Sequence, residues 1–230
     1  MKKSLLAIAT IIVLLFTSCS PLFKNSQSNF YKLFDNSAAF QLEKPHYTEI
    51  GTYKVKTACN ISVNVNDKRS NKKILKSFLD KNNEPIYNYT NLYAIPNEIT
   101  LVKNTYFDYL RNVGFTPVDY IAPDYYFNIN IIKFEVSYAE AIGWYSDVVL
   151  SIDVTDKNNL VVYATPEVAG HCELSKDSEE NRELNKTLAW PELRFEVGSK
   201  AIEKAYLSAL KAFDHSAMIS EIESHMLKNK

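Results

Sequence analysis

The sequence predicts an α+β domain: a mainly antiparallel four-stranded sheet with helices packed on one face. Segments in which apolar and polar residues alternate, as in half-buried strands, are interspersed with segments whose apolar residues recur at helical spacing. Their order along the chain is strand, helix, three strands, helix. Runs of strands and helices in such an order are typical of a sheet covered by helices. The hydrophobic content of 46% is ordinary for a globular domain.

The first predicted strand spans residues 59–66. Ile61, Val63 and Val65 alternate there with polar residues, so one face of the strand is expected to lie in the core. A polar break follows it, and the segment 72–80 is then predicted as one short helix.

The first long helix is predicted over residues 97–114. Pro96 stops helical structure from extending further back, and Asn97 can cap the first free backbone N–H groups. Apolar residues between these ends recur on one face. Gly114 supplies the residue in which a left-handed conformation is easiest, so the helix is expected to end there.

Three strands follow this helix. The strand predicted over 125–138 changes the phase of its apolar residues, so a β-bulge is expected near 131–132. Residues 144–155 and 160–171 are predicted to form an antiparallel hairpin around the turn 156–159. If the first two strands are parallel neighbours, the helix between them makes a right-handed crossover.

The chain after the strands is polar and then helical. Residues 173–185 are mostly acidic, which is consistent with a solvated loop or an exposed helix. A long helix is predicted from 198 to 213, with Ile202 and Leu210 in its apolar stripe. A further short helix is predicted over 216–227.

The amino terminus has the order of charge, apolar run and small residue that is typical of a secretory signal. Lys2 and Lys3 precede the apolar run Leu5–Phe16, which is too short for the roughly 20 residues that span a bilayer. Leu15–Cys19 resembles a lipobox, so we expect cleavage before Cys19 and lipid attachment to its thiol. The alternative is an ordinary signal peptide followed by a chance cysteine.

The predicted organisation is a signal peptide at 1–18, a tether at 19–47 and a single α+β domain at 48–230. The tether is rich in Ser, Asn and Lys, with one short helix expected around residues 30–34. Ser20, rather than Asp, follows the cysteine. By resemblance to enterobacterial sorting, this favours the outer membrane, with the domain on the periplasmic face.

The charge of the chain argues against a nucleic-acid partner. Loss of Lys2 and Lys3 with the signal changes the formal net charge from −1 to −3. A net negative charge is unlike the excess of basic residues that is typical of nucleic-acid-binding proteins. The expected membrane contact is the N-terminal lipid, because each buried CH₂ contributes about 0.8 kcal/mol to anchoring.

Two cysteines follow the predicted attachment site. Cys59 and Cys172 are predicted to be bridged, because export leads to an oxidising compartment. A loop this long gives a model stabilisation of roughly 4–5 kcal/mol. The alternative is two separate thiols that behave as small apolar side chains.

We find no catalytic constellation and predict neither enzyme activity nor a cofactor. The GxSxG, HExxH and phosphate-loop patterns are absent from the sequence. His171 and Cys172 are a poor dyad, because adjacent strand residues point to opposite faces. Asp67 and Arg69 are interpreted as a turn-stabilising ion pair in preference to an acid–base pair.

An acidic cluster is the only candidate for metal binding in the sequence. Asp177, Glu179, Glu180 and Glu183 lack the Asp-x-Asp-x-Asp-Gly core of a calcium loop. A solvated surface is the favoured interpretation, and no metal site is predicted.

Aromatic residues suggest where a partner binds. Tyr87, Tyr89 and Tyr93 precede the first long helix, and Trp144 and Tyr145 flank the turn between the second and third strands. Large amphipathic rings in loops are typical of contact surfaces. The alternative is that these rings fold back over the open edge of the sheet. Exposure distinguishes the two.

Short motifs resemble a known lipoprotein family. Val63–Arg69 is similar to the first strand and Asp-x-Arg turn of YajG-like lipoproteins, and Leu110–Phe115 resembles the end of their helix. The resemblance spans residues 59–213. The insertions 72–93 and 173–191 depart from it.

Tyr31–Leu33 and Asn91–Ala94 resemble segments of PqiC-like auxiliary lipoproteins of ABC-type transporters. Both resemblances imply a non-enzymatic envelope lipoprotein, and neither supplies catalytic residues. We expect a binding or structural outer-membrane lipoprotein with an envelope protein as partner. The alternatives are an auxiliary subunit of a lipid-transport complex, with a lipid ligand, and a hydrolase with an unrecognised site.

Overall fold

The structure is a computed structural model that describes residues 37–85, 91–119, 121–179, 181–183 and 192–229. Internal contacts divide the chain into two units. The larger comprises Ala38–Tyr87 and Leu92–Lys230, and apart from the first residue of two strands it contains the elements described below. The smaller, Met1–Ser37 with Asn88–Asn91, falls almost wholly outside the described residues.

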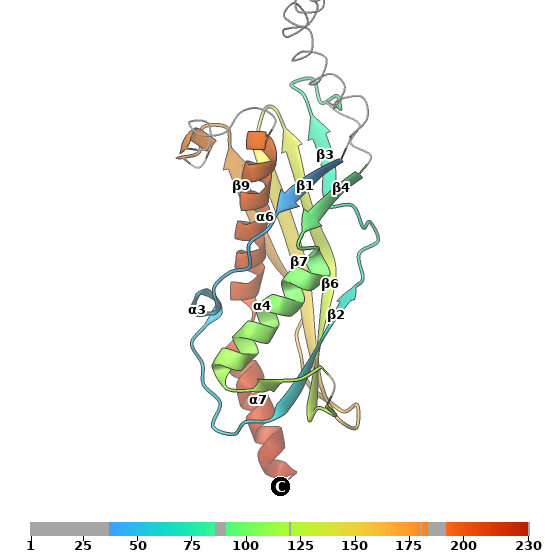
Figure 1. Ribbon diagram of the computed structural model, residues 1–230, viewed down its shortest axis with the longest axis vertical. Helices are drawn as coiled ribbons and strands as arrows, with labels where there is room; N and C mark the ends of the chain where they lie inside the picture. Colours follow the sequence, from blue (N-terminus) through green and yellow to red (C-terminus); the bar gives the residue numbers. More distant parts are fainter. Residues whose placement is uncertain (1–36, 86–90, 120, 180, 184–191, 230) are drawn as a thin grey trace, which may run out of the picture. The chain divides into compact units, whose positions relative to one another are not determined.

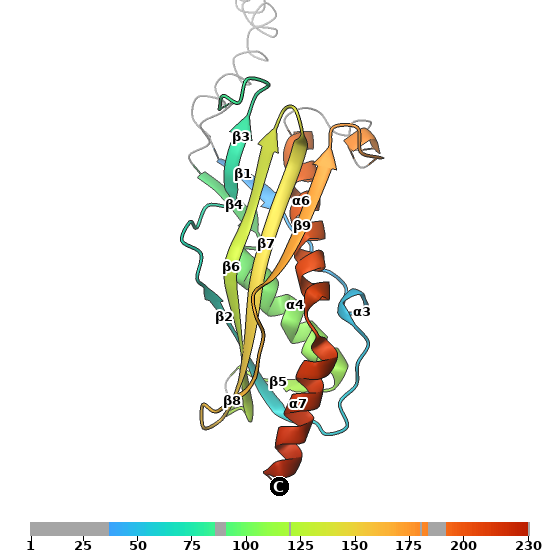
Figure 2. The same ribbon diagram turned by 180° about the vertical axis from the view of Figure 1, so that it is seen from behind.

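Seven strands form one mixed sheet (Figure 1). They are β2 (Asn60–Asp67), β3 (Leu75–Leu79), β5 (Thr116–Pro117), β6 (Tyr125–Ala139), β7 (Gly143–Asp156), β8 (Val161–Ala164) and β9 (Val168–Ser175). The long central strands β6 and β7 are antiparallel. β2 and β3 both run parallel to β6, whereas β8 and β9 both run antiparallel to β7 (Figure 2).

The expectation of a mainly antiparallel four-stranded sheet is therefore wrong in strand number and direction. The segment 72–80 contains strand β3 and not a helix, because the eight-residue β2 leaves part of the fifteen-residue β6 unpaired. β3 pairs with that part and places Phe78 in the core. The predicted strand 160–171 is two strands, since Pro166 has no N–H to donate and interrupts the ladder.

The predicted bulge in β6 is confirmed. The pairing of β6 with β7 shifts register between Ile131 and Lys133, so Ile132 is the extra residue. Alternate side chains from Phe127 to Ile131 are buried before the bulge, and the buried alternation restarts at Phe134 after it. One long strand thereby keeps its apolar residues on the core side along its whole length.

Within the described residues, the helices that accompany the sheet include α3 (Tyr47–Ile50), α4 (Glu98–Val113), α6 (Glu192–Ala212) and α7 (His215–Lys228). α4 confirms the predicted caps. The Asn97 side chain accepts a hydrogen bond from the Thr100 N–H, and Gly114 adopts a left-handed φ of 112°. α6 starts earlier than predicted, and α7 exceeds its prediction by one residue at each end. No helix within the described ranges has the length and apolar character to cross a bilayer.

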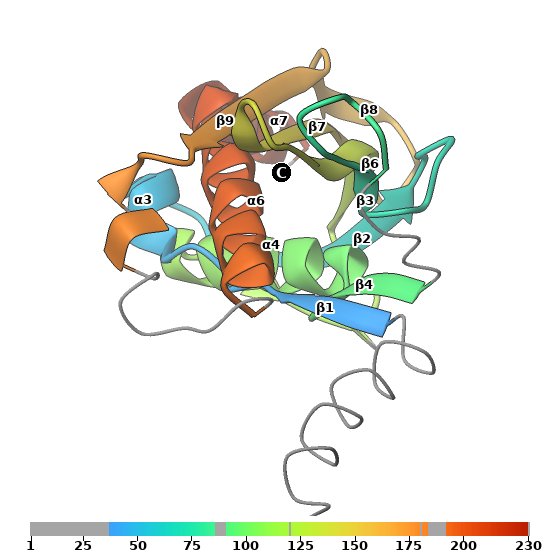
Figure 3. The same ribbon diagram turned by 90° about the horizontal axis from the view of Figure 1, so that it is seen from above.

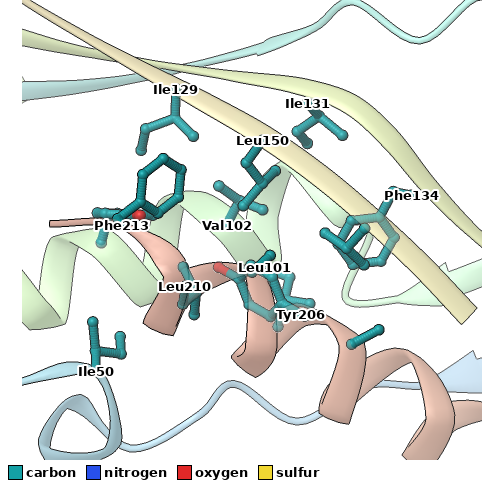
Figure 4. Packing of buried hydrophobic residues seen from close by; sticks show 14 of the residues in the cluster. Ile50, Leu101, Val102, Ile129, Ile131, Phe134, Leu150, Tyr206, Leu210 and Phe213 are labelled. Atoms are coloured by element: carbon teal, nitrogen blue, oxygen red, sulfur yellow. The ribbon is translucent and has the colours of Figure 1, made fainter. Parts of the chain in front are cut away.

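α4 and α6 pack on the apolar face of the sheet (Figure 3). α4 lies against β2, and α6 lies against β6, β7 and β9. Figure 4 shows Ile129, Ile131 and Leu150 of the strands facing Val102 of α4 and Tyr206 of α6. These five side chains are fully buried, so sheet and helices share one core.

Small residues set the distance between α6 and β9. A Cβ atom added to Gly170 would lie 2.0 Å from the Ala205 carbonyl oxygen and 2.3 Å from the Ala209 nitrogen. Both are backbone atoms of α6, which cannot rotate aside as a side chain can. Glycine at this position therefore allows the helix backbone to rest directly on the strand.

The folded domain begins before residue 47, the predicted end of the tether. β1 (Ser37–Gln41) pairs with β4 (Asn91–Ile95) in a separate two-stranded sheet. Phe40 and Leu42 are buried in the core, although both fall in the range assigned to the tether. Any tether therefore ends before β1.

Polar side chains are buried where α4 meets the start of α7. His215 is 2% exposed and lies 6.3 and 4.9 Å, between ring centroids, from Tyr106 and Tyr109. Its Nε2 atom and both tyrosine hydroxyls have no hydrogen-bond partner within the described part of the chain. Burial lowers the pKa of His215 from 6.5 to about 4, against the opposing influence of Phe213 and Asp214.

Stability is expected to fall as the pH drops from about 6.5 to about 4, because only the unfolded chain then protonates His215. The loss would reach about 3 kcal/mol at the lower limit. His215→Phe, which fits the aromatic surroundings, should flatten this dependence in urea unfolding measured at several pH values. Equal slopes for the two proteins would show that another group is responsible.

Candidate functional site

A pocket of about 490 Å³ lies between one end of the sheet and the last turns of α7. It is at the end of the domain where the C-terminus lies in Figure 1. The starts of β2 and β6 and the turn after β7 form one side, and α7 forms the other. Its principal lining residues are Cys59, Asp124, Tyr125, Asp156, His225 and Met226. The volume is within the range of small-molecule sites.

Two carboxylates of the pocket are fixed by backbone N–H groups. Asp124 accepts a hydrogen bond of 2.8 Å from the Asn60 N–H. Asp156 accepts bonds of 2.8 and 2.9 Å from the N–H groups of Asn158 and Leu160, as aspartate at the start of a turn commonly does. The Leu160 bond is the main cause that lowers the pKa of Asp156. Asp156 is therefore ionised at neutral pH.

His225 connects α7 to the sheet side of the pocket. Its Nδ1 atom lies 3.0 Å from the Tyr125 hydroxyl, and its Nε2 atom lies 3.9 Å from the Asp156 carboxylate. Burial is the main cause that raises the pKa of Tyr125 to about 12, with smaller contributions from Cys59, Asp124 and Asp156. Tyr125 is therefore a neutral hydroxyl in a pocket of negative potential.

The thiol in this pocket is not an activated nucleophile. Burial is the main cause that raises the pKa of Cys59 to about 12, and the charge of the Asp124 carboxylate accounts for part of the rise. Because the thiolate is the reactive form of cysteine, Cys59 is unreactive at neutral pH. The arrangement is suited to binding and supplies no nucleophile from this cysteine.

The predicted Cys59–Cys172 disulfide is wrong, because the two thiols are not bonded to each other. Cys59 directly precedes β2, level with the end of β6 that pairs with Asp156. Cys172 pairs with Ser146, farther along β7. At about 3.3 Å per residue, the separation along the sheet is roughly 30 Å, far beyond the 7 Å that a disulfide permits between Cα atoms.

His171 and Cys172 do not form a dyad. His171 pairs with Asp147 on the exposed face of the sheet, with Nδ1 2.7 Å from the carboxylate. Lys133 contacts the same carboxylate at 2.7 Å. Burial raises the pKa of Asp147, but hydrogen bonds from Lys133 and His171 outweigh it and the net shift is downward. This row of charges is a surface ion-pair network.

Asp67 and Arg69 form the expected ion pair. Arg69 donates to both Asp67 carboxylate oxygens at 2.9 and 3.0 Å. It also donates to Glu98 at 2.9 Å and to the Phe134 carbonyl at 3.2 Å. Arg69 is 7% exposed. It therefore ties the end of β2 to the start of α4 and to the bulged region of β6, which is a structural role.

The predicted partner-binding surface is wrong for Trp144. This side chain is 2% exposed. Its ring centroid lies 6.0, 5.6 and 5.2 Å from those of Phe40, Phe78 and Tyr138. Trp144 therefore covers the core, as the alternative interpretation requires.

The structure describes two of the other four aromatic residues of that prediction. Tyr93 on β4 is 49% exposed, and Tyr145 is half-buried on β7. Tyr87 and Tyr89 lie outside the described residues.

Two further predictions concern residues only partly described. Among the described residues, no group of three or more His, Cys, Asp or Glu side chains is arranged to hold a metal ion. Glu180 of the acidic cluster lies outside that part of the chain, as does Cys19. Lipidation of Cys19 therefore stays a prediction from sequence.

Comparisons with known proteins give structural likenesses alone. No family model and no curated protein match the sequence. The structure is similar to protein XCC0632 from Xanthomonas campestris, described as DUF330, with a TM-score of 0.49 and 10% identity over 84% of this chain and 99% of that chain. It is also similar to the hypothetical protein CT253 from Chlamydia trachomatis, with a TM-score of 0.41 and 8% identity over 73% of this chain and 97% of that chain. Similarity at this level says nothing about a shared function.

Proposed function

We propose that the protein is a lipid-anchored component of the outer membrane whose domain faces the periplasm and binds a ligand or partner without catalysing a reaction. The observation that carries the proposal is the lipobox-type segment Leu15–Cys19 after a short apolar run. Such a signal directs export, and acyl chains on Cys19 would hold the mature chain to a membrane.

The pocket beside α7 supports binding over catalysis. Its thiol is protonated, and its carboxylates already accept hydrogen bonds from backbone N–H groups. Fixed polar groups of this kind orient a ligand, because they lose little freedom when it arrives. The domain thus offers a preformed site for a ligand.

Cys19→Ala is expected to abolish acylation and to leave uncleaved precursor, because the lipoprotein signal peptidase acts on the modified cysteine. Metabolic labelling with an alkyne fatty acid and membrane fractionation measure both effects. Cys172→Ala, which leaves the lipobox intact, is the matched control and should be labelled like the wild type. Normal labelling of the Cys19→Ala protein would refute the anchor.

The second candidate is an auxiliary subunit of an ABC-type lipid-transport complex. The observation that favours it is the apolar edge of the pocket, where Leu160 and Met226 line the cavity. Such a subunit should co-purify with transporter components after cross-linking in membranes. Recovery of the protein without them would support the simpler binding function.

A further inference from the structure

Apolar side chains line one edge of the pocket. Leu160, which directly precedes β8, is 59% exposed and lines the cavity. Met226 of α7 lines the same cavity and packs in part against the core. The pocket therefore offers an apolar edge that a hydrocarbon group can cover.

The interior of the same pocket is acidic. Asp124 and Asp156 reach it from two different strand ends, and each is fixed by the backbone bonds described above. Burial is the main cause that raises the pKa of Tyr125 in this pocket, and the negative charges of Asp124 and Asp156 act in the same direction. Two basic side chains also line the pocket: Lys157 follows Asp156 in the turn, and His225 Nε2 lies 3.9 Å from the Asp156 carboxylate.

We propose that this pocket binds an amphiphilic organic cation, with its ammonium group between the carboxylates of Asp124 and Asp156 and its apolar chain along Leu160 and Met226. The assignment deepens the proposed function and rests on it for the premise that the domain binds a ligand. It does not depend on lipidation of Cys19, so the two can fail separately.

Charge and solvation together select this ligand class. An anionic amphiphile would meet two carboxylates of its own sign in a partly dehydrated pocket. A neutral apolar molecule would displace water from Asp124 and Asp156 and would offer these carboxylates no hydrogen bonds in return. Loss of hydration without such compensation is costly for ionised groups. An ammonium group donates to both carboxylates, and an attached alkyl chain covers the apolar edge at the same time.

Methyl NMR on the full chain, whether or not Cys19 carries lipid, tests the proposal directly. The sequence contains three methionines, of which Met1 falls in the predicted signal, Met226 lines the pocket, and Met218 is buried at 1% exposure elsewhere on α7. With ¹³C-methyl methionine, hexylammonium should shift Met226 in a saturable way and leave Met218 unchanged. Hexanol and hexanoate should bind at least about tenfold more weakly.

Matched variants test whether the negative charge of Asp124 is needed to bind the cation. Asp124→Asn keeps an oxygen that can accept from Asn60 and should weaken hexylammonium binding about tenfold. Asp177→Asn removes the same charge from an exposed position after β9 and should have no effect. Leu160→Ser should weaken hexylammonium but leave methylammonium, which has no chain, unchanged. Equal binding of hexanoate, or an unaltered Asp124→Asn titration, would overturn the proposal.

Two sources of the ammonium group are distinguished by one comparison. A short-chain phosphatidylethanolamine carries the group beside a phosphate, which Lys157 could pair with. Tighter binding of this lipid than of hexylammonium, lost in Lys157→Ala, would identify a lipid headgroup as the natural ligand. Tighter binding of hexylammonium would identify a free alkylamine. A Met226 signal that neither compound moves would contradict both.

Discussion

Trp144→Ala should destabilise the domain by about 3–5 kcal/mol, the usual cost of truncating a buried aromatic residue. The ring is 2% exposed and packs on Phe40, Phe78 and Tyr138, which come from three different strands. Alanine would leave a cavity that these rings cannot close without moving apart. In a chain of this size, the melting temperature should fall by about 10 °C, measured by circular dichroism.

Tyr145 provides the matched control on the same strand. It is half-buried and points to the opposite face of the sheet, so Tyr145→Ala should change stability by at most about 1 kcal/mol. If the Trp144→Ala protein has the melting temperature of the wild type but no longer binds a partner, the assignment of Trp144 to the core is contradicted. That result would restore this tryptophan to the partner-binding surface.

Arg69→Met is expected to cost about 3–5 kcal/mol, because it leaves buried carboxylates without their cation while keeping most of the side-chain volume. The Glu98 and Asp67 side chains are only 11% and 14% exposed. Lys72 contacts Asp67 at 3.0 Å and would compensate only that partner. Chemical denaturation at neutral pH measures the loss.

The pH dependence of this loss identifies its origin. Hydrogen bonds from Arg69 are the main cause that holds the pKa of Asp67 well below its ordinary value of 3.8. This stabilisation is complete above that value and is lost as the pH falls below it, so the gap between wild type and Arg69→Met should narrow in acid. Arg111→Met, which removes an arginine stacked 5.0 Å from Phe107 on α4, is the surface control and should have little effect. A gap that is independent of pH would argue for lost packing instead.

Elements specified by local sequence signals could be predicted correctly. Asn97 and Gly114 define the ends of α4 through their own caps, and the phase change in the apolar pattern of β6 locates the bulge at Ile132. Both signals act between residues close in the sequence. No distant partner is needed to interpret them.

Strands that form because they pair with distant segments could not be predicted from their own sequences. β3 is a strand because part of the β6 edge lacks another partner, and β1 is ordered by pairing with β4, about fifty residues later. Neither condition is visible within the short segments themselves. In the same way, the sequence around Cys59 and Cys172 does not indicate the distance between the two thiols in the folded sheet.

One error could have been avoided from the sequence. The inward alternation of Val148, Leu150 and Ile152 on β7, extended back by two steps, reaches Trp144 and assigns it to the core. The candidate pocket is different, because it combines residues as distant as Cys59 and His225. Of the pocket residues, Asp156 is the one that a sequence signal marked, because it begins the predicted turn 156–159.

Mass spectrometry of the N-terminal peptide from the purified membrane protein tests most directly whether the mature chain begins at a lipidated Cys19. We predict a peptide that starts at Cys19 and carries the mass of a diacylglyceryl group, with or without a further acyl chain on its amino group. A peptide that starts at Met1, or an unmodified Cys19 at or near a new amino terminus, would contradict it.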